Sequence, residues 1–141
     1  MHFNLVDAVV ERSETRIVTI KQVSNAEEYL QDHFPGFPVL PGVMMVESVV
    51  QAARLLLEPK AGGARLVLGS VRALKYGRFV RPGDSLRVEV TLHKENPDGS
   101  FEVKAEGHAV RSWAPVAATT PDAPSGPAAV AGRLVLRPVR M

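Results

Sequence analysis

The sequence contains no cysteine, few aromatic residues and only a small excess of positive charge. The absence of cysteine excludes a disulfide scaffold, a thiolate metal site and a cysteine nucleophile, and it is consistent with a reducing, cytoplasmic location. No apolar run approaches the roughly 18 residues that a membrane-spanning helix needs. The N-terminus also lacks the basic segment and apolar core of a secretory signal. The net charge of +2 is too small to favour nucleic acid as a partner.

The 141 residues that are present are enough for one domain. Apolar residues make up 45% of the chain and charged residues 23%, so the chain can form a hydrophobic core. This composition excludes a disordered, collagen-like or coiled-coil chain. We therefore expect a single domain over residues 1–141.

One long helix is predicted from Val43 to about Glu58, because good helix formers fill this stretch and Pro59 ends it. Its polar residues recur at helical spacing and form one narrow stripe: Glu47, Gln51, Arg54 and Glu58. A surface helix has a broad polar face, so this pattern indicates a mostly buried helix with a single polar seam.

Strand patterns surround this helix. Runs of β-branched or alternating residues predict strands over residues 15–23, 65–76, 85–94, 100–111 and 132–139. Turns are predicted at 82–84 and 96–99, and a capping box predicts a short helical turn over 24–29. Residues 114–131 are rich in Ala and Pro, and we expect a flexible or extended insertion there. The pattern as a whole predicts an α+β domain, with a sheet folded around a helix.

The histidines show no metal-ligand spacing, and the sequence has neither a phosphate-binding loop nor a serine nucleophile elbow. His33 differs from the other histidines because it precedes a proline-locked loop that leads into the predicted helix. The N-terminus of that helix offers unpaired N–H groups that can hold a developing oxyanion. Glu47 follows one turn into the helix and could act as a general acid. The alternative is that His33 caps the short helical turn and Glu47 is simply solvated.

A specific motif favours the catalytic interpretation of His33 and Glu47. Residues 33–44 read His-Phe-Pro-Gly-Phe-Pro-Val-Leu-Pro-Gly-Val-Met, and Glu47 and Gln51 follow on the predicted helix. Residues 3–7 and 75–86 provide two further matches. With these residues the sequence resembles the 3-hydroxyacyl-[acyl-carrier-protein] dehydratases of the FabZ type over roughly residues 3–111. The spacing of His33 and Glu47 is that of the family's catalytic pair.

The resemblance implies a hotdog fold, an antiparallel sheet wrapped around one long central helix, over the single domain. It also implies removal of water from a (3R)-hydroxyacyl-[acyl-carrier-protein] thioester to give the trans-2-enoyl thioester, in fatty-acid or related lipid or polyketide biosynthesis. His33 would take the C2 proton and Glu47 would assist departure of the hydroxyl group. Backbone N–H groups at Gly42 and Val43 would polarise the thioester carbonyl. The matched residues Phe34, Pro41 and Gln51 would complete the substrate site.

The implied partners are an acyl carrier protein and a second copy of the chain. Each active site of the homodimer would combine His33 of one subunit with Glu47 of the other, and assembly into a trimer of dimers stays open. No metal or redox cofactor is implied, because the substrate brings its own phosphopantetheine arm. We expect the acidic carrier to dock at Arg72, Lys75, Arg78 and Arg81, for which the alternative is a solvated strand face.

Two other functions remain as alternatives. A hotdog acyl thioesterase would cleave the same class of thioester without needing the His-Phe-Pro-Gly motif. A non-catalytic acyl-carrier-binding subunit could keep the fold, but both candidate catalytic residues, His33 and Glu47, are present.

Overall fold

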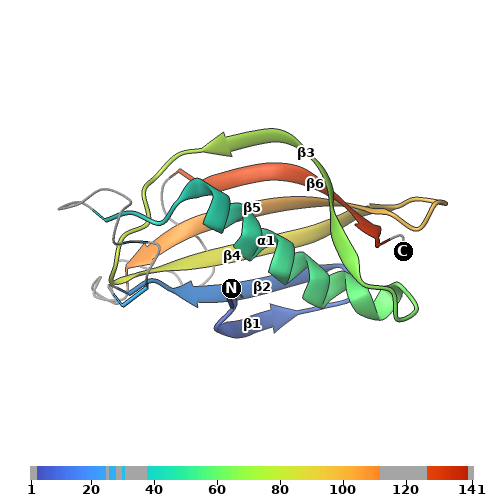
Figure 1. Cartoon of the computed structure of the whole chain (residues 1–141), viewed down its shortest axis with the longest axis horizontal. Coiled ribbons are helices and arrows are strands. Elements are labelled where there is room, and N and C mark those ends of the chain that lie inside the picture. The colour runs from blue at the N-terminus through green and yellow to red at the C-terminus, as the bar shows by residue number, and fades with distance from the viewer. Residues whose placement is uncertain (1–2, 25, 28–29, 31–37, 112–126, 140–141) are drawn as a thin grey trace.

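The computed structural model describes residues 3–24, 26–27, 30, 38–111 and 127–139. In this part of the chain, one long helix lies across one face of a six-stranded antiparallel sheet that curves around it (Figure 1). The elements are β1 (Ala8–Arg12), β2 (Arg16–Gln22), α1 (Gly42–Leu57), the 3₁₀ helix η2 (Glu58–Lys60), β3 (Leu66–Tyr76), β4 (Asp84–Glu95), β5 (Phe101–Arg111) and β6 (Val130–Pro138). The strands lie in the order β1-β2-β4-β5-β6-β3. The predicted α+β class, with a sheet around one central helix, is confirmed.

The sheet forms because successive side chains of its central strands alternate between the buried core and the partly exposed outer face. In β4, the side chains of Leu86, Val88 and Val90 are fully buried, and those of Arg87 and Glu89 between them are half-buried. The same period-two pattern recurs in β5, which pairs with β4 along its whole length. The predicted turns on either side of β4 are also present, and Gly83 and Gly99 adopt positive φ angles of 95° and 88° there. The four strands predicted from alternation over 15–111 are therefore confirmed.

Helix α1 covers the concave face of this sheet. The predicted helix is confirmed within one residue at each end, and Pro59 lies in the 3₁₀ helix η2 that follows. Its core-facing side chains pack against β2, β4 and β5 and are buried: Met45, Ser48, Val49, Val50, Ala52, Ala53, Leu56 and Leu57. The predicted polar seam, from Glu47 to Glu58, is half-buried along the helix. No helix in the described ranges has the length and apolar character needed to cross a membrane.

Two features of the sheet differ from the sequence-based expectation. Strand β1 was not predicted, because all five of its side chains are exposed and no alternation marks it.

The predicted insertion at 114–131 is wrong at its C-terminal end. Ala129 and Val130 are buried, and the Ala129 N–H donates to the Gly107 carbonyl at 2.8 Å, so these small residues join the core. Residues 114–126 lie outside the described residues, as does part of the predicted helical turn at 24–29.

The burial of α1 makes a direct prediction about stability. Leu57 is completely buried in the core, whereas Leu55, two residues earlier, is 40% exposed. Leu57→Ala is expected to lower the free energy of unfolding by about 2–5 kcal/mol, because it removes buried methyl groups and leaves a cavity. The control Leu55→Ala should change it by only about 0.5 kcal/mol. Urea unfolding of both variants measures the difference, and equal losses would contradict the packing of α1 described above.

Candidate active site

Glu47 is held in place by the residue one turn further along α1. The Gln51 side-chain amide donates a hydrogen bond to Glu47 Oε1 at 3.2 Å. The same amide group donates to the Phe3 carbonyl at 2.8 Å, and Gln51 Oε1 accepts from the Leu5 N–H at 2.7 Å. Gln51 therefore links the half-buried Glu47 carboxylate to the N-terminal segment of the chain, and its side chain is fixed by three hydrogen bonds.

The N-terminal segment is itself anchored at two further points. Ser48 Oγ, on the buried face of α1, donates to the Leu5 carbonyl at 2.9 Å, and Leu5 is almost fully buried. The Asp7 carboxylate accepts from the Gln22 N–H at 2.7 Å and lies 3.4 Å from Lys21 Nζ. Residues 3–7, which carried part of the resemblance, thus form a fixed strap between α1 and β2.

The N-terminus of α1 has no side-chain cap among the described residues. The residue before the helix, Pro41, provides no side-chain cap, and the first turn contains no acidic residue. The Pro41 carbonyl accepts from the Met44 and Met45 N–H groups at 3.0 and 3.1 Å. The N–H groups of Gly42 and Val43 have no acceptor among the described residues. They therefore remain as donors at the positive end of the helix dipole, the arrangement that stabilises an oxyanion.

Tyr76, at the end of β3, packs against this helix start. A Cβ atom built on Gly42 would lie 2.7 Å from two carbon atoms of the Tyr76 ring, so only glycine allows the ring this position. The ring is 53% exposed and therefore borders solvent beside the Gly42 and Val43 donors. Sequence reasoning did not assign Tyr76 to the site, because it lies 34 residues after Gly42 and only the fold brings the two together.

The other predicted site residues fall into two groups. His33 and Phe34 lie outside the described residues, so their roles stay predictions. The predicted docking residues are all exposed: Arg72, Lys75, Arg78 and Arg81. They follow one another along β3 and the segment after it. The Arg81 N–H donates to the Asp84 carboxylate at 3.0 Å and so forms part of a turn.

Strand pairing places two unpredicted basic residues beside Arg72. In the sheet register, Arg72 of β3 lies opposite Arg133 of β6, and Arg133 lies opposite Lys104 of β5. All three side chains are exposed and line one surface pocket together with Glu102, so the row is a surface feature with an excess of positive charge. No local motif could have revealed it, because the three residues come from distant segments.

Comparison with known proteins decides the family. A family model described as ApeI-like, ApeI dehydratase, matches residues 9–113. The chain belongs to the ApeI-like dehydratase family. Its curated relatives include the 3-hydroxyacyl-[acyl-carrier-protein] dehydratase FabZ of Lactobacillus helveticus, 44% identical over 92 residues, which are 64% of this chain and 62% of the relative. The FabZ of Thermotoga petrophila is 46% identical over 88 residues, 62% of this chain and 64% of the relative. The resemblance to FabZ-type dehydratases is confirmed, although the match spans less than two thirds of these relatives' length.

Solved structures identify the fold of this dehydratase-family chain. It is similar to the dehydratase heterocomplex ApeI:P from Xenorhabdus doucetiae, with a TM-score of 0.64, 16% identity and coverage of 96% of this chain and 99% of the other. An acyl-CoA hydrolase from Bacillus cereus has a TM-score of 0.66 at 15% identity, covering 90% of this chain and 67% of the other. At such low identity these likenesses show the fold alone, and they confirm the predicted hotdog fold.

The linkage through Gln51 can be tested by unfolding. Gln51→Leu leaves the Leu5 N–H and the Phe3 carbonyl without their partner, so it is expected to lower the free energy of unfolding by about 1–3 kcal/mol. Glu58→Gln is the matched control, because Glu58 lies on the same polar seam but has no bond to the strap among the described residues. It should change stability by about 0.5 kcal/mol at most. Similar values for both variants in urea unfolding would show that the strap is not anchored through Gln51.

Proposed function

We propose that this protein removes water from 3-hydroxyacyl thioesters to give trans-2-enoyl thioesters, the reaction for which its curated relatives are named. The observation that carries the proposal is the pairing of a fixed carboxylate with free donors on one helix. Glu47 is held by Gln51 one turn into α1, and the Gly42 and Val43 N–H groups are unpaired among the described residues. The His-Phe-Pro-Gly motif at 33–36 precedes this helix in the sequence.

In this mechanism each residue has one task. The N–H groups of Gly42 and Val43 donate to the thioester carbonyl oxygen, which makes the C2 proton more acidic. His33 takes that proton as general base, and the electron pair of the C2–H bond becomes the C2–C3 double bond. Glu47, in its protonated form, gives its proton to the 3-hydroxyl group, which leaves as water. The step moves protons and changes no oxidation state overall, so it needs no redox cofactor.

The substrate carrier follows from the same relatives, whose names specify an acyl carrier protein. We place its docking surface on the predicted residues Arg72, Lys75, Arg78 and Arg81, extended by the row that Arg72 forms with Arg133 and Lys104. An acidic carrier would meet complementary charge there, which speeds encounter and fixes orientation. The concentration of salt should therefore affect KM for a carrier-bound substrate more than KM for a coenzyme A thioester.

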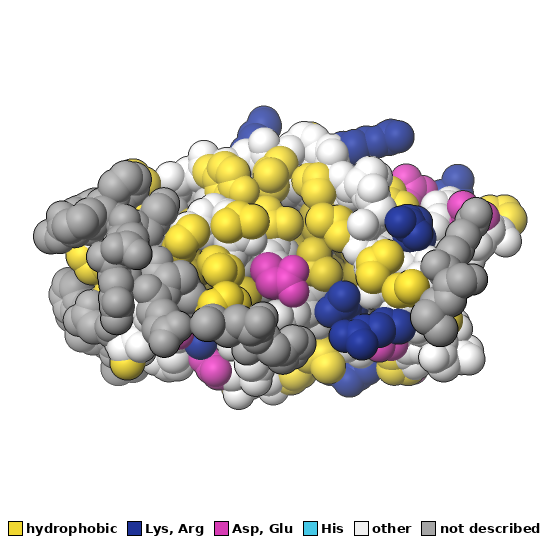
Figure 2. Space-filling view, in the orientation of Figure 1, with side chains coloured by type: hydrophobic (Ala, Val, Ile, Leu, Met, Phe, Trp, Pro, Cys, Tyr) yellow, Lys and Arg dark blue, Asp and Glu magenta, His cyan; other side chains and the backbone are white. Residues whose placement is uncertain are grey.

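A homodimer is the proposed assembly, and β3 is the edge through which it forms. Strand β3 is an 11-residue edge strand, whereas the opposite edge, β1, has only 5 residues and offers less backbone for pairing. Exposed apolar side chains lie along β3 and just after it: Leu74, Tyr76 and Phe79. Figure 2 shows further hydrophobic side chains gathered over the helical face of the subunit. Pairing of two β3 strands would cover this apolar surface.

The thioesterase alternative rests on structural neighbours that are acyl-CoA hydrolases, and these share only the fold. The two activities differ in their products. Dehydration produces enoyl absorbance and leaves the thioester intact, whereas hydrolysis releases a free thiol. Following both signals with 3-hydroxyacyl thioesters, on carrier protein and on coenzyme A, distinguishes the two functions directly.

The role of Glu47 predicts a large kinetic effect. Glu47→Gln cannot donate a proton to the leaving hydroxyl, so turnover should fall by about 10²–10⁴-fold. His33→Ala should cause a loss of the same order. The control Glu106→Gln changes an exposed carboxylate on β5 and should leave turnover unchanged. Enoyl absorbance measures the rates and circular dichroism confirms folding. Wild-type turnover in Glu47→Gln would overturn the proposed mechanism.

Sharing of the active site between subunits predicts rescue. In a mixed dimer of His33→Ala and Glu47→Gln subunits, one site carries both substitutions and the other carries neither. Random exchange makes about half of the dimers mixed, each with one intact site of two, so activity should recover to roughly a quarter of wild type. The two variants are unfolded and refolded together, and native mass spectrometry verifies exchange. Verified exchange without recovery would mean that the two residues do not act across the interface.

A further inference from the structure

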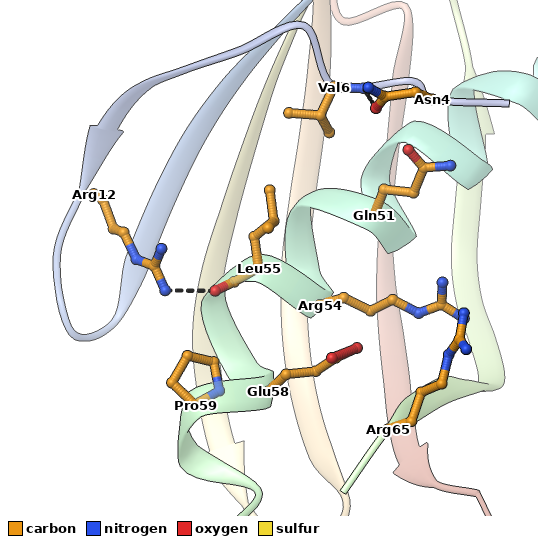
Figure 3. A pocket seen from close by; sticks show the side chains of 9 residues that line it. All are labelled: Asn4, Val6, Arg12, Gln51, Arg54, Leu55, Glu58, Pro59 and Arg65. Carbon is orange, nitrogen blue, oxygen red and sulfur yellow. Dashed lines mark hydrogen bonds between the residues drawn. The ribbon is translucent and has the colours of Figure 1, made fainter. Parts of the chain in front are cut away.

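A cavity lies at the opposite end of α1 from the Gly42 and Val43 N–H groups. It has a volume of about 700 Å³ and opens between the C-terminal half of α1, β1 and the N-terminal strap (Figure 3). This volume is within the range of small-molecule sites. Its lining contains three arginines, one glutamate, two amides and three apolar residues: Arg12, Arg54, Arg65, Glu58, Asn4, Gln51, Val6, Leu55 and Pro59.

The arginines reach the cavity from three separate elements. Arg12 comes from β1 and donates to the Leu55 carbonyl. Arg54 comes from α1, and its Nε donates to the Leu66 carbonyl at 2.8 Å, which fixes the guanidinium group while leaving its other N–H groups available. Arg65 lies in the segment before β3, and Figure 3 draws its guanidinium group beside that of Arg54. The backbone bonds therefore position two of the three cations.

Positive charge exceeds negative charge among the described residues that line this cavity. No ion pair joins Arg12, Arg54 or Arg65 to any carboxylate among the described residues. Glu58 also lines the cavity, but one carboxylate faces three guanidinium groups. Neighbouring guanidinium groups repel each other, and an anion bound between them would replace this repulsion with electrostatic attraction. Arginine is well suited to phosphate, because its planar group forms two parallel hydrogen bonds to phosphate oxygens.

We propose that this cavity binds a small organic molecule that carries a phosphomonoester. The phosphate would lie against Arg54 and Arg65, with Arg12 facing it from β1. Val6, Leu55 and Pro59 would contact the organic part of the ligand, because they provide an apolar wall in the same cavity. The cavity contains neither Glu47 nor the Gly42 and Val43 donors and meets the proposed active site only at Gln51. Binding of a ligand there does not depend on the proposed dehydration.

Isothermal titration calorimetry with four probes tests the assignment and the source of the phosphate. Adenosine 5′-monophosphate represents nucleotides, glycerol 3-phosphate represents lipid precursors, and adenosine and inorganic phosphate each provide one half of a ligand. At least one organic phosphate should bind at least about tenfold more tightly than inorganic phosphate, and adenosine should bind weakly, because both halves of the ligand contribute. Absence of binding by both organic phosphates, or equal affinity for inorganic phosphate, would overturn the proposal.

Substitution of one arginine locates the binding. Arg65→Gln is the variant of choice, because the Arg65 side chain is exposed and its backbone carbonyl, which accepts from Val139, is retained. It should weaken binding by about tenfold or more, the effect of losing one charge-assisted hydrogen bond. Arg137→Gln is the matched control, an exposed arginine at the same end of the sheet that does not line the cavity. Equal weakening in both variants, or none in Arg65→Gln, would contradict the site.

Discussion

Burial of the apolar face of α1 against the concave side of the sheet is the constraint on which the rest of this structure depends. Met45, Val49, Leu56 and Leu57 fill the space above β2, β4 and β5, so the helix cannot rotate without exposing them. With that face fixed, the remaining side chains of the helix must point away from the core. The polar seam from Glu47 to Glu58 is one such set of side chains, and the packing of the core fixes the direction in which it points.

The same constraint divides the outer side of the helix into two chemical regions. At the N-terminal end lie Glu47 and the Gly42 and Val43 donors, where the helix dipole is positive and no described side chain caps the helix. At the C-terminal end lie Arg12, Arg54 and Arg65 around their own cavity. Gln51 stands between the two regions, bonded to Glu47 and lining the cavity. The one long helix among the described residues thus carries both the proposed acid–base site and the proposed anion site.

The N-terminal strap shows how a segment without regular structure is anchored to the helix that carries Glu47. Leu5 supplies a buried side chain, a donor to Gln51 and an acceptor for Ser48. Its backbone groups are satisfied by side chains of the helix rather than by a strand. The strap fixes the Gln51 side chain, which in turn holds Glu47.

The sequence by itself determined the features that depend on local pattern. Alternation in residues 85–94, the helical spacing of the polar seam and the motif at 33–44 are visible in short windows, and they predicted the strands, the helix and the family. Tertiary structure alone decided what depends on long-range register. Strand β1 exists because it pairs with β2, Val130 is buried because β6 lies between β5 and β3, and Arg72 meets Arg133 and Lys104 only through strand pairing. A local window contains no information on such pairings, because their energy comes from residues far apart in the chain.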